Sequence, residues 1–180
     1  YMLYLLGYRS FDSEFIAALP AFADPSYLFA KAQNCTHLII VSDGSEYANI
    51  ALDFAVEIAQ LAGASIKLMN VFEYPVATAY TTLDISGPDP AEGEIAKQMM
   101  DQAKNNIKKL TQNPDYSSVQ FETEVKIGNP FVNISETLTK EDVDLVVMGS
   151  KGATGLEEVL VGSNAEKVVR HAPCPVICVK

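Results

Sequence analysis

The sequence predicts an α/β fold in which residues 36–180 form a five-stranded, parallel, doubly wound sheet. Short apolar runs, typical of strands that are buried on both faces, alternate with amphipathic helical patterns. Each run is followed by a turn rich in Gly, Ser, Asp or Asn. Strands that alternate with helices form parallel sheets with right-handed crossovers. Ligands of such sheets bind beyond the carboxyl ends of the strands, where the strand order reverses.

The first half of this pattern predicts two strands and two helices. Residues 36–41 form a strand, and Ser45 is the N-cap of a helix that stops at a C′ glycine, Gly63. Residues 65–72 form the second strand. A long irregular stretch, 73–90, separates it from an amphipathic helix that buries its face at Ile95, Met99, Ala103, Ile107 and Leu110.

The second half predicts three strands and two helices. Apolar and charged residues alternate along 119–127, which indicates an edge strand with a solvent-exposed charged face. Asn129 and Pro130 begin a helix, and residues 145–148 form the fourth strand. Ser163 and Glu166 make a capping box for a last helix that ends near His171. The fifth strand covers 175–179.

Residues 1–35 do not follow the repeat and are expected to be an N-terminal extension or arm. Phe11, Phe15, Ile16 and Leu19 are spaced as one helical face. The arm is expected to pack on the domain or on a second subunit, and a docking or linker role within a larger protein is the alternative.

Composition excludes several functional classes. The 180 residues carry a formal net charge of −10, which disfavours nucleic acid and anionic membrane surfaces as partners. No run is long enough for membrane insertion. Three cysteines without a C-x-x-C pair argue against a disulfide framework or a zinc site and favour reduced thiols in the cytoplasm. His37 and His171 lie far apart in the sequence, so neither a metal site nor a catalytic histidine is expected.

The glycines after the fourth strand are the most informative feature of the chain. Gly149, Ser150 and Gly152 follow the apolar run 144–148, and after nine intervening residues Gly162-Ser163-Asn164 open the next helix. Glycines let the backbone approach a phosphate, and the N–H groups of a helix N-terminus attract anions. The spacing is neither a P-loop nor a dinucleotide fingerprint.

This G-x-x-G-x9-G-S pattern resembles the nucleotide motif of the universal stress protein family. Three other pieces, 39–45, 69–71 and 128–130, resemble the family in the same order, so the resemblance covers about residues 36–180. It implies an ATP-binding domain of the stress response, usually a homodimer. One difference is Val41-Ser42, where family members often have Pro-Thr or Pro-Val before the aspartate.

By position, the resemblance implies a role for each residue of an ATP site. Asp43 would meet the ribose or adenine, beside the strand end at Val41 and Ser42, and the backbone of Val71 would bind adenine. Met148, Gly149 and Ser150 would line the floor, and Gly152, Gly162, Ser163 and Asn164 would hold the phosphates, with Mg²⁺ alongside. Asp43 and Ser163 also have structural alternatives, as a turn residue and a helix cap.

Three functions therefore remain open from the sequence. The first is an ATP-binding regulatory module, the second a slow ATP hydrolase or phosphotransferase, and the third a nucleotide-free dimeric interaction domain. No catalytic residue stands out, so at most weak ATPase activity is expected. The apolar last strand leaves an edge free for a homodimer, unless the arm at residues 1–34 covers that edge and leaves a monomer.

Overall fold

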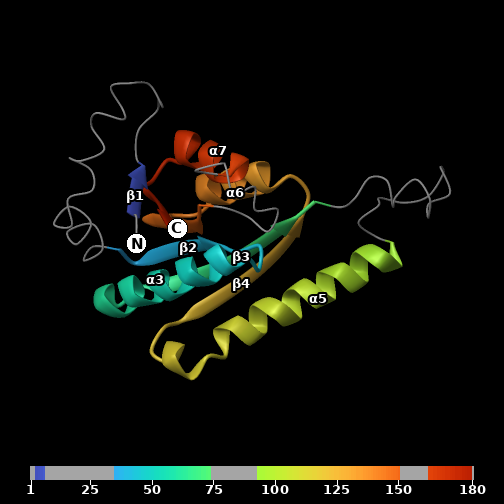
Figure 1. Ribbon diagram of the computed structural model, residues 1–180, viewed down its shortest axis with the longest axis horizontal. Coiled ribbons are helices and arrows are strands. Elements are labelled where there is room, and N and C mark those ends of the chain that lie inside the picture. The colour runs from blue at the N-terminus through green and yellow to red at the C-terminus, as the bar shows by residue number, and fades with distance from the viewer. Residues whose placement is uncertain (1–2, 7–34, 74–92, 151–161, 180) are drawn as a thin grey trace.

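The computed structural model describes residues 3–6, 35–73, 93–150 and 162–179 (Figure 1). In chain order the strands are β1 (Leu3–Leu6), β2 (His37–Val41), β3 (Ser65–Phe72), β4 (Phe121–Ile127), β5 (Leu145–Gly149) and β6 (Val176–Val179). The α-helices are α3 (Glu46–Ala62), α5 (Glu94–Thr111), α6 (Pro130–Lys140) and α7 (Ser163–His171), and a short 3-10 helix covers Pro114–Tyr116.

The strands form one six-stranded sheet in the order β1-β6-β5-β2-β3-β4. The five strands from β2 to β6 are parallel, as predicted, and β2 lies beside β5. The chain winds outward in both directions from this β2–β5 pair, so the pair is the point where strand order reverses.

The sixth strand corrects one premise of the sequence analysis. The outer edge of β6 is not free, because β1 pairs with it in the antiparallel direction. The expected homodimer through the C-terminal strand relied on a free edge at this position. The alternative, that the N-terminal arm covers the edge, is confirmed for Leu3–Leu6.

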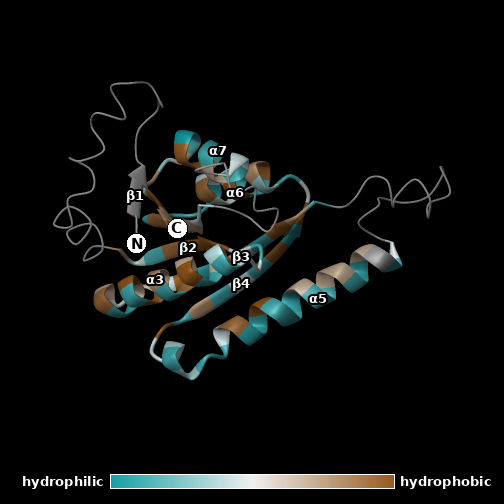
Figure 2. Ribbon diagram, viewed as in Figure 1, coloured by the Kyte–Doolittle hydropathy of each residue, from teal (hydrophilic) through white to brown (hydrophobic). Residues whose placement is uncertain are grey.

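Two helical layers cover the sheet. Helices α3 and α5 lie on one face, and α6 and α7 lie on the other (Figure 1). Side chains that alternate along each central strand enter the two cores in turn: Ile40 and Val147 pack under α3, whereas Ile39 and Val146 pack under α6 and α7. Hydrophobic residues therefore gather on the strands and the inner helix faces, while the outer face of α5 is hydrophilic (Figure 2).

Most of the predicted helix boundaries are confirmed. The Ser45 hydroxyl accepts a hydrogen bond from the Ala48 N–H at 3.2 Å, and Gly63 ends α3 with φ 67°. Asn129 caps α6, and Pro130 is its first residue. The predicted capping box of α7 is wrong, because Gly162 is the N-cap and Glu166 instead pairs with Arg170.

Strand β4 is an edge strand, as predicted, but its charged face is not fully exposed. Glu122 is 71% exposed, whereas the side chains of Glu124 and Lys126 are 29% and 27% exposed. Lys126 pairs with Glu124 and donates a hydrogen bond to the Thr137 hydroxyl on α6 at 2.7 Å. Glu124 also lies against Lys67 on β3, which is 11% exposed and lies among Glu122, Glu124 and Glu141. Burial alone would lower the pKa of Lys67, but these carboxylates outweigh it and raise that pKa above its usual value.

Within the described ranges, no helix has the length and hydropathy needed to cross a membrane. The predicted irregular stretch at 73–90 falls almost entirely outside the described residues, as does the proposed helical face at Phe11 to Leu19.

Candidate functional site

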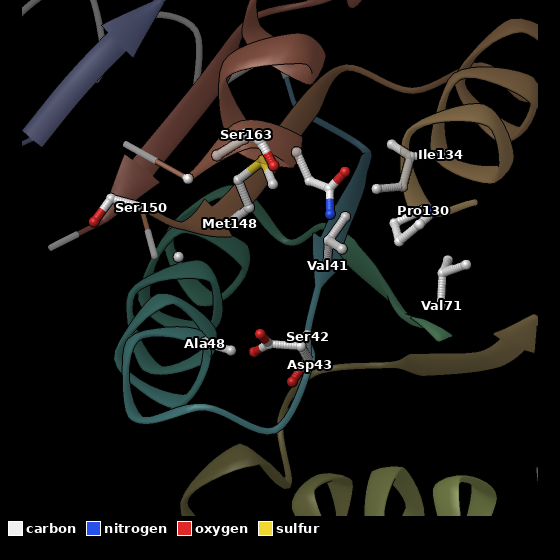
Figure 3. A pocket seen from close by; sticks show the side chains of 14 residues that line it. Val41, Ser42, Asp43, Ala48, Val71, Pro130, Ile134, Met148, Ser150 and Ser163 are labelled. Atoms are coloured by element: carbon white, nitrogen blue, oxygen red, sulfur yellow. The ribbon is translucent and has the colours of Figure 1, made fainter. Parts of the chain in front are cut away.

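A cavity of about 150 Å³ lies at the carboxyl ends of β2, β3 and β5, beside the first turns of α3, α6 and α7 (Figure 3). It therefore sits where the strand order reverses, the position expected of a ligand site in a parallel sheet. Ser42 and Asp43 lie on one side of it, Met148 and Ser163 on another, and Val71, Pro130 and Ile134 on a third (Figure 3).

The cavity brings together the residues singled out in the sequence. The predicted residues that line it are Val41, Ser42, Asp43, Val71, Met148, Gly149, Ser150, Gly162, Ser163 and Asn164. Gly152, the remaining member, lies outside the described residues. These residues come from four segments of the chain, and their convergence depends on the pairing of β2 with β5, which the sequence had left open.

Four lining residues were not predicted: Ala48, Pro130, Ile134 and Ala165. Pro130 and Ile134 are four residues apart on α6, so they share the face that the first turn presents to the strand ends. That i, i+4 spacing directly after the Asn129 cap was the signal available in the sequence. Ala48 and Ala165 are small residues in the first turns of α3 and α7, and no sequence pattern distinguishes them from ordinary core alanines.

A chain of local hydrogen bonds fixes the loop after β2. The Ser42 hydroxyl accepts a bond from the Gly44 N–H at 3.2 Å, and the Asp43 carboxylate accepts one from the Ser45 N–H at 3.0 Å. The second bond is an Asx turn. The structural alternative for Asp43 is therefore confirmed, and the same turn holds Asp43 beside the cavity.

The backbone of Val71 faces the cavity side of β3. The Met69 carbonyl accepts a bond from the Ser42 N–H at 2.9 Å, so Met69 directs its backbone groups toward β2. Backbone groups alternate in direction along a strand, which places those of Val71 on the same side. Strand β2 ends at Val41, opposite Met69, so the N–H and C=O of Val71 point beyond the end of the ladder.

Gly149 has a packing role that the sequence did not reveal. A Cβ at this position would lie 2.9 Å from the backbone carbon of Tyr47 and 3.0 Å from the Ala48 nitrogen. Only glycine lets the end of β5 approach the first turn of α3 this closely. The absence of a side chain at 149 thus brings α3 against the wall of the cavity.

The N-terminus of α7 lines the cavity. Its N-cap is Gly162, which has no side chain to cap the first-turn N–H groups. The Gly162 N–H donates to the Ser150 carbonyl at 2.6 Å, which joins this helix start to the end of β5. The Ser150 hydroxyl is buried and has no hydrogen-bond partner among the described residues. A buried polar group without a partner requires an explanation.

Among the described residues, charged side chains contribute little to this site. Of the described residues that line the cavity, Asp43 alone is ionisable. An anion would therefore bind through backbone N–H groups and hydroxyls, with the positive end of the α7 dipole providing the electrostatic attraction. Within the described part of the chain, no three His, Cys, Asp or Glu residues gather as a metal site.

Comparison with known proteins places this chain in a family. The model of the universal stress protein family matches residues 35–180. The universal stress protein MJ0531 of Methanocaldococcus jannaschii is 33% identical over 143 residues, which cover 79% of this chain and 81% of the relative.

Solved structures agree with that match. UspA from Lactobacillus plantarum has a TM-score of 0.64 and 26% identity, over 82% of this chain and 99% of the other. A universal stress protein solved in complex with cAMP has a TM-score of 0.51 and 20% identity, over 81% of this chain and 97% of the other. The chain belongs to the universal stress protein family.

Proposed function

We propose that this chain binds ATP, accompanied by Mg²⁺, in the cavity between β2, β5 and α7, and that it acts as a regulatory module of the stress response. The observation that carries the proposal is the glycine-capped N-terminus of α7, which opens onto a cavity at the point of strand-order reversal. Such helix starts bind phosphate groups through backbone N–H groups. The buried, unpartnered Ser150 hydroxyl supports the same ligand, because a phosphate oxygen would accept its hydrogen bond.

The preference for adenine rests on Val71. Its N–H and C=O offer one donor and one acceptor beyond the end of β2, which matches the alternating donor and acceptor on the edge of adenine. Guanine presents a different order of donors and acceptors, so GTP should bind more weakly. The family member solved with cAMP carried an adenine nucleotide, which is consistent with this choice.

The phosphates and the metal would be held without a cationic side chain from the described residues. Backbone N–H groups of Ser163 and Asn164 would hold the phosphates. Mg²⁺ would neutralise part of the phosphate charge, keeping phosphate oxygens and water as its main ligands. Asp43 is the one ionisable residue among the described residues that line the cavity. A single carboxylate supports at most slow hydrolysis of ATP.

We also propose a cytoplasmic location. Cys35, Cys174 and Cys178 are all free thiols. Disulfides are rare in the cytoplasm, where thiols stay reduced.

The test is calorimetry of ATP and GTP, each with Mg²⁺, on the full chain and on two variants of Gly162. Gly162 has φ −66° and ψ 152°, which any residue adopts, and aspartate and asparagine both favour the N-cap, so the fold should remain intact. Gly162→Asn supplies a neutral side chain that competes for the same N–H groups. Gly162→Asp adds a negative charge where the phosphates would bind.

We expect ATP to bind more tightly than GTP. We also expect the ATP affinity of Gly162→Asp to be at least about tenfold weaker than that of Gly162→Asn, because a charge repulsion of about 1.4 kcal/mol corresponds to a tenfold change in affinity. Equal ATP affinity in both folded variants would contradict the phosphate assignment. Mass spectrometry of ligand released from denatured protein checks the identity of the nucleotide independently.

A further inference from the structure

The outer edge of β6 is defined by two residues, Val176 and Cys178. The Val146 N–H donates to the Pro175 carbonyl at 3.0 Å, and the Ser150 N–H donates to the Val179 carbonyl at 2.8 Å. Residues 175, 177 and 179 therefore direct their backbone groups toward β5. The backbone N–H and C=O groups of successive residues point to opposite sides of a strand, so those of Val176 and Cys178 point away from β5 and toward β1.

The register of β1 decides which of its residues bind that edge. Leu6 lies opposite Val176, and Tyr4 lies opposite Cys178. In an antiparallel pair, opposite residues whose backbone groups face each other exchange both hydrogen bonds. Tyr4 and Leu6 thus carry the main-chain bonds to β6, whereas the backbone groups of Leu3 and Leu5 point outward.

We propose that β1 is a built-in cap of the β6 edge, which excludes a second copy of this chain from that edge. Val176–Val179 is uncharged and rich in β-branched residues, so it can pair with its own copy in the antiparallel direction about a two-fold axis. That pairing needs the backbone groups of Val176 and Cys178. These are the groups that β1 occupies, so the two arrangements exclude each other.

The covalent connection favours the cap. About thirty residues separate Leu6 from His37, and a short tether holds a segment at an effective concentration of about millimolar. A second copy present at micromolar concentration is therefore at a disadvantage of about a thousandfold for equal intrinsic affinity. Each copy also carries a net charge of −10, so two copies repel each other. The full chain should be a monomer at micromolar concentration.

The cap is also suited to being the last strand of the sheet. It is four residues long, and very short edge strands are one way in which proteins avoid further edge-to-edge pairing. Pairing of β1 with β6 does not depend on ATP binding. The two strands lie at one end of the sheet, and the backbone groups that join them, those of Val176 and Cys178, do not line the cavity.

Two proline variants of the full chain test the proposal and control for each other. Tyr4→Pro removes an N–H that bonds to Cys178, whereas Leu5→Pro removes an N–H that points outward, where an edge strand tolerates proline. Light scattering at micromolar concentration gives the mass, and circular dichroism checks the fold. The expected masses are the 19.6 kDa of one chain for the unmodified protein and for Leu5→Pro, and twice that value for Tyr4→Pro.

Amide hydrogen exchange supplies a second measurement that needs no variant. In the unmodified chain, the Val176 and Cys178 amides should stay protected over roughly a hundredfold range of protein concentration, because bonds within one chain do not depend on concentration. Protection lost on dilution would overturn the proposal. A dimeric unmodified chain, or a folded Tyr4→Pro variant that stays monomeric, would overturn it as well.

Discussion

The side-chain amide of Asn70 donates a hydrogen bond to the backbone carbonyl of Ser42 at 2.6 Å and so ties the carboxyl ends of β3 and β2 together. The Ser42 N–H, in turn, donates to the Met69 carbonyl at 2.9 Å. Both the backbone N–H and the backbone C=O of Ser42 are thus hydrogen-bonded to residues of β3. Since Ser42 and Val71 both line the cavity, this pair of bonds sets the distance between two of its walls.

Asn70→Ala should therefore weaken ATP binding as well as stability. We expect a loss of about 0.5–1.5 kcal/mol in the free energy of unfolding, the usual contribution of one hydrogen bond, measured by urea titration. The matched control is Asn133→Ala, whose amide donates to the Asn129 carbonyl within α6 at 3.0 Å. The control removes an exposed hydrogen bond but places a better helix former in α6, so it should change stability little and retain ATP affinity. Equal effects of both variants on affinity would contradict a positioning role for Asn70.

Gly149→Ala should destabilise the fold by about 1–3 kcal/mol, the usual cost of forcing an extra carbon into close packing. The atoms that the new Cβ would meet belong to the backbone of Tyr47 and Ala48, which cannot rotate away as a side chain could. The free energy of unfolding in urea measures the effect. An unchanged unfolding midpoint would show that β5 and α3 are less closely packed than described.

Asp144 gives the fold a dependence on acidic pH. Its carboxylate accepts bonds from the Thr36 N–H at 2.8 Å, the Thr36 hydroxyl at 2.9 Å and the His37 N–H at 3.1 Å. The Thr36 N–H is the main cause of a lowered pKa, which the other bonds reinforce against the effect of burial. A lowered pKa in the folded state stabilises the protein above the unfolded value, and this stabilisation is lost as the pH falls through the folded value.

Asp144→Asn should accordingly lower the unfolding free energy at pH 7, and the difference from the unmodified chain should shrink at pH values below the ordinary 3.8 of an aspartate. Urea midpoints at neutral and acidic pH measure this. The exposed neighbour Asp142 provides the control, since Asp142→Asn should change neither midpoint appreciably. A constant difference between Asp144→Asn and the unmodified chain at all pH values would refute the assignment.

The cysteines should react slowly in the folded protein. Burial raises the pKa of Cys35 to about 12, that of Cys174 to about 11 and that of Cys178 to about 12. Because the thiolate is the reactive form, an aromatic disulfide reagent at pH 8 should label all three rapidly only after denaturation. Cys174, which is half-buried, should react first in the native state. Rapid native labelling of Cys178 would contradict its burial in β6.

The sequence was sufficient to predict the sheet because the strands depend on local signals, whereas most residues of the candidate site were named by the resemblance to a family. Apolar runs gave the strands, and Asp43, Gly149 and Gly162 each stand at the end of a strand or the start of a helix. Parallel topology then brings strand ends together whatever the loops between them do. The convergence of Val71 and Met148 on one cavity needs, in addition, the strand order that places β2 between β3 and β5.

The features that were missed, or held only as an alternative, depend mostly on contacts across the chain. Pairing between Leu3–Leu6 and Val176–Val179 joins the two ends of the sequence, and no local pattern selects that partner. The half-burial of Glu124 and Lys126 arises from contacts with other elements, Lys67 on the next strand for Glu124 and Thr137 on α6 for Lys126, which no local alternation of residues reveals. The cap of α7 was placed one residue late, because Ser163 and glycine are both acceptable caps and only the backbone angles decide between them.

The contact between Gly149 and the first turn of α3 has a consequence for how a ligand would be received. At one wall of the cavity, backbone packs directly against backbone. This wall has no side-chain rotamers that could rearrange, so its shape is fixed. Any adjustment to different ligands must come from side chains elsewhere in the lining, such as Ser163 and Asn164, which are exposed on α7. Related nucleotides should therefore share one position of the base and differ in the placement of their phosphates.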